Sequence, residues 1–166
     1  MFKEIKFDEI KKELLEKLKK DFALVTAGTE KDLNTMTVSW GAFGELWSKD
    51  IATIYIRESR HTLKYLEKEE YFTITFYGKE YKKELLLCGT KSGKDIDKVK
   101  ETGFTTMYDK APFFKEANIV LICKKVSKTD FKNIEIYDKS IINDNYSDND
   151  YHYAYNGIIE KVLVKE

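Results

Sequence analysis

The sequence predicts a mainly β protein of the α+β type, a small antiparallel barrel with short peripheral helices. Six or seven short segments are rich in β-branched and aromatic residues, which is typical of strands. The helical segments are short and do not alternate regularly with these strands, so a doubly wound parallel sheet is disfavoured. The length of 166 residues suits one domain, residues 1–166, and the single proline, Pro112, leaves no proline-rich linker.

The predicted helices follow from apolar spacing. Steps of three and four predict an amphipathic helix from Asp8 to Lys20, capped by Asp8, through Phe7, Ile10, Leu14 and Leu18. Leu63 and Leu66 predict a short helix within residues 61–70, and residues 94–101 predict another. The polar run over residues 143–150 is typical of an exposed loop.

The predicted strands are runs of apolar, β-branched and aromatic residues. A buried run that ends at a glycine begins the series, and the most strongly β-forming runs read IATIYIR, YFTITFY and ANIVLICKKV. In chain order the strands cover residues 22–28, 37–40, 51–57, 71–77, 117–126, 131–137 and 157–164.

Charge and cysteine usage exclude several function classes. The 29 basic and 29 acidic residues cancel, which argues against a nucleic-acid-binding protein. No run of 18 apolar residues predicts a membrane span, and the first residues lack the apolar core of a signal peptide, so we expect a cytoplasmic protein. Cys88 and Cys123 lie 35 positions apart and are interpreted as buried thiols. No H-E-x-x-H, catalytic triad or other metal-ligand spacing is present, so no metal is expected.

Arginine usage points to an anion site. Of the 29 basic residues only two are arginine, and both lie in the tetrapeptide Arg57-Glu58-Ser59-Arg60. The planar guanidinium binds a phosphate through two parallel hydrogen bonds, which lysine cannot do. The tetrapeptide also falls at a predicted strand-to-helix junction, where free backbone N–H groups favour an anion. The alternative interpretation is a surface ion pair with Ser59 as an ordinary helix cap.

Polar and apolar side chains alternate in Asn34–Gly41. A strand there would put Thr35, Thr37 and Ser39 on one face. Small polar groups beside Trp40 suit a flat heteroaromatic ring, which needs hydrogen bonds and stacking. The alternative is the solvent-facing edge of a strand.

Two further segments carry weaker signals. Gly89–Lys98 lacks the spacing of a P-loop, which excludes a nucleoside triphosphatase; it is either a general anion-binding loop or a solvated lysine-rich turn. His152, one of two histidines, lies between Tyr151 and Tyr153 and is either structural or part of a site.

Taken together, four motifs resemble one family. In chain order these motifs are N-T-M-T-V-S-W, R-E-S-R-H-T, C-G-T-x-S-G-K-D-x-D-K and D-Y-H-Y before G-I-I-E. This order is similar to that of the flavin reductase-like proteins that bind FMN, especially the flavoredoxin-type branch. The resemblance covers residues 22–164. It implies an FMN-binding split β-barrel that works as a homodimer, with the flavin near the subunit interface.

The resemblance also implies which residues bind FMN. The isoalloxazine and ribityl chain would contact Asn34, Thr35, Met36, Thr37 and Trp40. The phosphate would be received by Ser59, Arg60 and Thr62. A second phosphate and ribityl contact would come from Ser92, Gly93, Lys94 and Lys98, and His152 would lie near the ring. No residue is assigned as catalytic, because the flavin itself performs the redox chemistry.

The resulting expectation is an FMN-binding oxidoreductase that takes electrons from NADH or NADPH. No G-x-G-x-x-G is present, so the nicotinamide would bind transiently over the flavin rather than in a domain of its own. One alternative is a flavin-binding electron carrier without nicotinamide activity. Another is a non-enzymatic small-barrel module that binds nucleic acid, which the zero net charge disfavours.

Overall fold

Ten strands and eight short helices make up the structure, a computed structural model that describes residues 1–166. The strands are β1 (Phe2–Ile5), β2 (Ala23–Gly28), β3 (Leu33–Val38), β4 (Gly41–Leu46), β5 (Lys49–Arg57), β6 (Tyr71–Phe76), β7 (Thr106–Asp109), β8 (Ala111–Phe114), β9 (Ile119–Asp130) and β10 (His152–Lys165). The helices are η1 (Phe7–Glu9), α1 (Lys11–Asp21), α2 (Leu63–Lys68), η2 (Lys79–Tyr81), α3 (Lys82–Thr90), α4 (Lys98–Thr102), η3 (Phe131–Asn133) and α5 (Lys139–Asn145).

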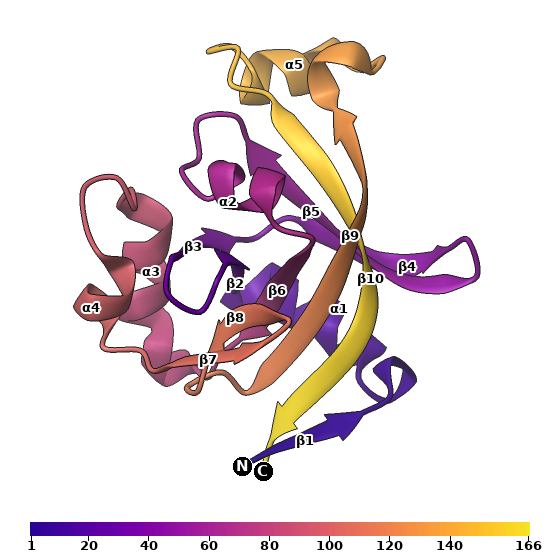
Figure 1. The fold of residues 1–166 in the computed structure, drawn as a ribbon. Coiled ribbons are helices and arrows are strands. Elements are labelled where there is room, and N and C mark those ends of the chain that lie inside the picture. The colour runs from indigo at the N-terminus through magenta and orange to yellow at the C-terminus, as the bar shows by residue number, and fades with distance from the viewer.

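Eight of the strands form one antiparallel sheet in the order β3-β2-β6-β9-β10-β5-β4, with β1 added to β10. The long strands β9 and β10 run side by side across the molecule, and the sheet curves around them (Figure 1). The register between them shifts at Asn156/Gly157 and again at Ile159/Lys161. Such irregularities bend strands and help a sheet to close. The predicted mainly β class with an antiparallel barrel and peripheral short helices is therefore confirmed.

Gly157 lies at the first of these irregularities, where β10 crosses a crowded part of the core. A Cβ atom at this position would come within 2.6 Å of the Phe72 ring and 2.9 Å of the Cys123 Cβ. Only a glycine lets the bent strand approach β6 and β9 so closely.

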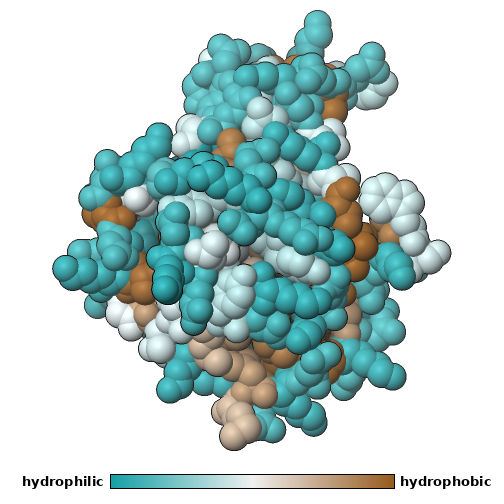
Figure 2. All heavy atoms as spheres, in the orientation of Figure 1, coloured by the Kyte–Doolittle hydropathy of each residue, from teal (hydrophilic) through white to brown (hydrophobic).

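The core lies inside the curved sheet. Helix α1 buries Leu14 and Leu18 against it, and Phe72 and Tyr155 of the sheet are fully buried in the same cluster. A second cluster lies under α3 and the β7–β8 hairpin and includes Phe114. Cys88 and Cys123 are free and buried, as predicted. Apolar side chains reach the face seen in Figure 2 only in small groups among hydrophilic ones. No helix is both long enough and apolar enough to cross a membrane.

Most predicted elements are present with shifted ends, and the first helix starts later than expected. Asp8 does not cap it: residues 7–9 form η1, and α1 begins at Lys11 with Ile10 as its N-cap. The Asp8 carboxylate instead lies 2.6 Å from Lys11 Nζ. The predicted strand over residues 37–40 lies earlier, as β3, because residues 33–38 pair with β2 along its whole length. The helix predicted over residues 94–101 is reduced to α4.

Near the end of the chain, one prediction is wrong and another is right only in part. Residues 131–137 do not form a strand, because β9 leaves the sheet at Asp130, whose carboxylate accepts the Lys132 amide and starts η3. The loop predicted from residue 143 contains the last turn of α5. The sequence pattern did not show the strands β1, β4, β7 and β8, nor the helices η2, α3, η3 and α5.

Candidate functional site

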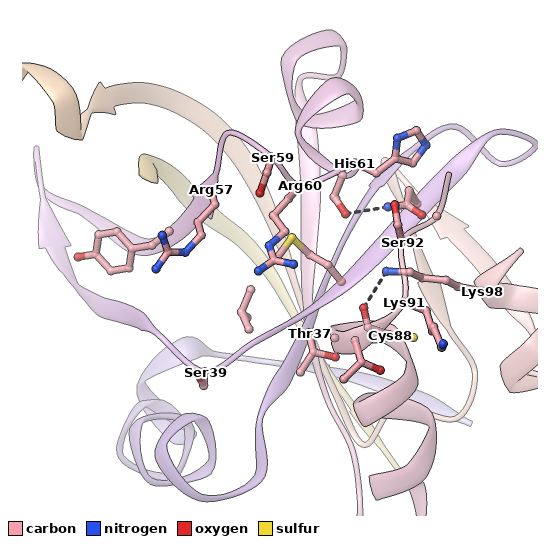
Figure 3. A pocket seen from close by; sticks show the side chains of 18 of the residues that line it. Thr37, Ser39, Arg57, Ser59, Arg60, His61, Cys88, Lys91, Ser92 and Lys98 are labelled. Atoms are coloured by element: carbon pink, nitrogen blue, oxygen red, sulfur yellow. Dashed lines mark hydrogen bonds between the residues drawn. The ribbon is translucent and has the colours of Figure 1, made fainter. Parts of the chain in front are cut away.

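A cavity of about 300 Å³ opens beside the ends of β3 and β5 (Figure 3). Five parts of the chain line it: β3 with its link to β4, the end of β5 with the turn into α2, the end of α3 with the loop after it, the first residue of α4, and the first residue of β10. The lining residues are Asn34, Met36, Thr37, Val38, Ser39, Trp40, Tyr55, Arg57, Ser59, Arg60, His61, Thr62, Cys88, Gly89, Thr90, Lys91, Ser92, Gly93, Lys98 and His152. Segments up to 118 positions apart thus meet at one place.

The charge of this cavity is of one sign. Both arginines of the chain line it, together with Lys91 and Lys98, and no aspartate or glutamate does. In a chain with equal numbers of basic and acidic residues, such a separation is a local feature of the site. Cations around a concave wall raise the local concentration of anions. The cavity therefore suits an anionic ligand, and we call it the cationic cavity.

The two arginines have different roles. The Arg57 guanidinium donates to the Asp150 carbonyl at 2.6 Å and to the Asn145 carbonyl at 3.0 Å, so it holds the loop that precedes β10. The Arg60 side chain makes no hydrogen bond or ion pair with another residue, and its guanidinium points into the cavity (Figure 3). Arg60 thus presents a free fork of donors to a ligand.

Ser59 is engaged by a neighbouring carboxylate. Its hydroxyl donates to Asp150 Oδ2 at 2.6 Å and its amide donates to Oδ1 at 3.0 Å. The serine lines the cavity, but a phosphate could take these two donors only if Asp150 moved. In this structure, Ser59 anchors the turn to the loop before β10.

Asn34 and Thr62 form a polar pair at the cavity wall. Asn34 Nδ2 donates to Thr62 Oγ1 at 2.8 Å, and both residues are buried. A hydroxyl that accepts one hydrogen bond can still donate its own proton. Gly93 lies against this pair, and a Cβ on it would overlap the Asn34 side-chain oxygen. The loop after α3 can approach β3 here because residue 93 is a glycine.

Lys98 forms part of the cavity floor. It is buried, and its ammonium donates to the Thr35 carbonyl at 2.8 Å and to the Cys88 carbonyl at 2.7 Å. Burial lowers the pKa of Lys98. Since an ammonium has three protons, one remains for a ligand. Burial also raises the pKa of Cys88 to about 11, so this thiol stays protonated at neutral pH.

His152 and Trp40 form the aromatic end of the cavity. Their rings lie 5.4 Å apart, and Trp40 is half exposed. The Tyr146 hydroxyl lies 2.8 Å from His152 Nδ1. Burial and the nearby Arg57 cation lower the pKa of His152 to about 4, so its ring is neutral at pH 7.

Eleven of the thirteen predicted site residues line this cavity, and Thr35 and Lys94 do not. Thr35 pairs with Thr26 across β2, and their hydroxyls lie 2.9 Å apart in the interior. Thr35 lies on the same face of β3 as Thr37, as the alternation predicted, but two positions further along the strand, where it lines a neighbouring cavity. Lys94 lines a neighbouring cavity of about 600 Å³.

Several lining residues were not predicted. Arg57 was noted for its rarity, but the motif comparison carried over only Arg60. Tyr55 lies two positions before Arg57 on β5, so strand periodicity could have placed it on the same face. Ser39 lies on the polar face that the alternation singled out, and Gly89, Thr90 and Lys91 belong to the possible anion-binding loop, but none of them was carried over as a site residue. Nothing beyond their place in the motifs marks the remaining ones: Val38, His61 and Cys88.

Comparisons with known proteins identify the family and the fold. A family model described as the flavin reductase like domain matches residues 15–152. No curated protein matches the chain. Among solved structures, flavoredoxin from Methanosarcina acetivorans is 20% identical, with a TM-score of 0.68 over 87% of this chain and 68% of that chain.

Two further solved structures share the fold. An FMN-binding domain of a flavin reductases-like enzyme from Shewanella baltica is 13% identical, with a TM-score of 0.71 over 99% of this chain and 77% of that chain. The styrene monooxygenase flavin reductase from Pseudomonas putida is 15% identical, with a TM-score of 0.62 over 87% of this chain and 79% of that chain. The fold is thus the split barrel of the flavin reductase-like proteins.

Proposed function

This chain belongs to the flavin reductase-like domain family, and from that premise we propose that it is an oxidoreductase that binds FMN in the cationic cavity. The observation that carries the proposal is the concentration of four cations and no carboxylate around one cavity. FMN has a phosphate dianion, a hydroxylated ribityl chain and a flat ring. The cavity offers groups of matching chemistry: cations, small hydroxyl side chains and, at one end, aromatic rings.

The phosphate would be held by residues whose donors are free. Arg60 has no other partner and would make paired, charge-assisted hydrogen bonds with two phosphate oxygens. The Thr62 hydroxyl accepts from Asn34 and would donate to the phosphate. The remaining proton of Lys98 would point to the same charge. These groups would fix the phosphate and thereby the position of the ring.

When bound, FMN supplies the hydride and single-electron chemistry of the reaction, and the residues around it bind and orient it. Trp40 and Met36 offer apolar surface to a flat ring at one end of the cavity. His152 is neutral there and offers a hydrogen-bonding group without a positive charge. Donors near the ring would stabilise the negative charge that reduction adds to it.

The electron donor in this proposal is NADH or NADPH, bound transiently over the exposed ring. The similarity to a styrene monooxygenase flavin reductase supports a reaction in which flavin is reduced. The similarity to flavoredoxins favours a second candidate, a flavin-binding electron carrier without nicotinamide activity.

We also propose that the chain works as a homodimer, as the resemblance implied, and that it is cytoplasmic, as expected from its sequence. The β4–β5 hairpin projects from the body of the molecule (Figure 1) and exposes Leu46 and Trp47, which are 41% and 62% accessible. Exposed apolar side chains of this size are typical of an interface. Sedimentation of the FMN-loaded protein at micromolar concentration tests this proposal: one chain mass would contradict it.

Binding and reduction are tested in two steps. Titration of the apoprotein with FMN, followed by tryptophan fluorescence, should show saturable binding, and riboflavin, which lacks the phosphate, should bind more weakly. Anaerobic addition of NADH or NADPH should then bleach the visible absorption of the flavin. Binding without bleaching would favour the electron carrier, and the absence of FMN binding would refute both candidates.

A further inference from the structure

The turn between β5 and α2 already holds an oxyanion of the protein's own. Both oxygens of the Asp150 carboxylate accept a hydrogen bond from Ser59: Oδ1 from the amide at 3.0 Å and Oδ2 from the hydroxyl at 2.6 Å. Two donors that converge on two oxygens of one anion also suit a phosphate. Ser59 lines the cationic cavity next to Arg60, whose side chain is free (Figure 3). The carboxylate therefore occupies donors at the edge of the cavity in which the phosphate is proposed to bind.

The negative charge of Asp150 has no cation to compensate it. Arg57 donates to the Asp150 carbonyl at 2.6 Å, but it forms its one ion pair with Asp148, at 4.0 Å. No lysine, arginine or histidine forms an ion pair with the Asp150 carboxylate, so its hydrogen-bond donors are those of Ser59 alone. A phosphate brought to Arg60 would meet this charge, and the Coulomb repulsion between two anions lowers the affinity of the second.

The backbone around Asp150 is held independently of its side chain. The Asp150 carbonyl accepts from Arg57. The next carbonyl, that of Tyr151, accepts from the Glu58 amide at 3.0 Å. Rotation about the side-chain bonds of Asp150 is therefore enough to free Ser59, while the loop stays in place. Ser59 is exposed and Asp150 is only half-buried, so a released carboxylate would enter water.

We infer that Asp150 competes with the phosphate of FMN for the Ser59 donors, and that this competition weakens FMN binding and speeds FMN release. On binding, the Asp150 side chain rotates into water, and the Ser59 amide and hydroxyl donate to the phosphate instead. The cost of releasing Asp150 is subtracted from the binding free energy, so the protein holds FMN as an exchangeable ligand. The inference rests on the proposed function, since FMN is the ligand, and it adds the residue that sets how tightly FMN is held.

The first test compares the affinities of the apoproteins for FMN and for riboflavin, which lacks the phosphate. Asp150→Ala should tighten FMN binding about 10- to 150-fold relative to riboflavin, because Ser59 can then donate to the phosphate without a competitor. Asp150→Asn keeps the size of the side chain and removes its charge, so it should tighten FMN binding by a smaller factor. An unchanged ratio of FMN to riboflavin affinity in Asp150→Ala would overturn the inference, and so would weaker FMN binding.

The second test asks whether the tighter binding depends on Ser59. A double variant that combines Asp150→Ala with Ser59→Ala lacks the hydroxyl donor, so it should bind FMN about tenfold more weakly than Asp150→Ala alone. Equal FMN affinities of these two variants would overturn the competition.

Asp144→Asn is the matched control for charge. Asp144 lies on α5 in the same part of the chain, and its side chain makes no hydrogen bond or ion pair. Removal of this exposed charge should change FMN affinity less than about twofold. An equal effect of Asp144→Asn and Asp150→Asn would show that only the general charge of this region matters, and would overturn the role of the contact with Ser59.

The third test measures FMN release by stopped-flow dilution of the loaded proteins, followed by flavin fluorescence. FMN should leave Asp150→Ala about 10- to 150-fold more slowly than the wild-type chain, because affinity differences between related complexes lie mostly in the dissociation rate. Equal release rates would overturn the inference.

The outcomes separate this inference from the proposed function. If the wild-type chain binds FMN and Asp150→Ala binds it with the same affinity and release rate, the inference fails and the proposed function stands. If neither the wild-type chain nor any variant binds FMN, the proposed function itself fails, and the inference fails with it.

Discussion

Replacement of Arg60 by alanine should weaken FMN binding by about 10- to 150-fold. A hydrogen bond to a charged group contributes about 1.5–3 kcal/mol, and each 1.4 kcal/mol corresponds to about tenfold in affinity. This substitution should change FMN binding without changing the stability of the protein, because the Arg60 guanidinium has no partner in the protein. Its removal leaves no buried group unsatisfied, so the unfolding free energy of the apoprotein should change by less than about 0.5 kcal/mol.

Three further variants separate geometry from charge. Arg60→Lys should recover only part of the affinity, because an ammonium cannot make the paired contact. Lys94→Ala removes a cation near the cavity that does not line it, so FMN affinity should fall less than twofold. Arg57→Ala should instead lower the melting temperature, since Arg57 holds the Asp150 and Asn145 carbonyls.

The assay is a titration of each apoprotein with FMN, followed by tryptophan fluorescence and repeated at two salt concentrations. Unchanged affinity in Arg60→Ala would refute the phosphate site. An equal loss of FMN affinity in Lys94→Ala would show that only the general field of the cations matters, and would also refute the paired contact of Arg60 with the phosphate.

Three other predictions concern single residues. Burial lowers the pKa of His152 to about 4 from 6.5, so the stability that its neutral ring contributes is complete above about pH 6.5 and is lost as the pH falls toward 4. This contribution to the unfolding free energy is at most about 3 kcal/mol. The melting temperature of the wild-type chain should therefore fall more steeply with acid than that of His152→Asn. Gly93→Ala should displace the Asn34 side chain and cost about 1–3 kcal/mol in chemical denaturation, and an unchanged midpoint would contradict this close approach. Trp40→Leu should abolish most of the fluorescence quenching by FMN and Trp47→Leu should leave it; the reverse result would move the ring to the β4–β5 hairpin.

The class of the fold and most of its strands follow from the pattern of residues along the chain. The bounds of β5 and β6 were predicted to within about two residues, because runs of β-branched and aromatic residues strongly favour a buried strand. Short or irregular elements escaped prediction. β4 contains two glycines and lies at the sheet edge, and its pairing with β5 depends on a turn in which Trp47 and Ser48 adopt positive φ angles of 56° and 54°. Nothing in the local pattern indicates that conformation for these residue types.

The sequence also determined where an anion site lies, since the scarcity of arginine singled out one turn. Which of the two arginine side chains is free depends on contacts that form when the chain folds. The partners of Arg57 lie 88 and 93 positions away, and no local pattern reveals a contact between residues so distant. For the same reason Thr35, which alternation placed in the site, proved to pair with Thr26 in the interior. Local patterns specify which backbone a segment can adopt, whereas the partner of each polar side chain depends on how the whole sheet closes.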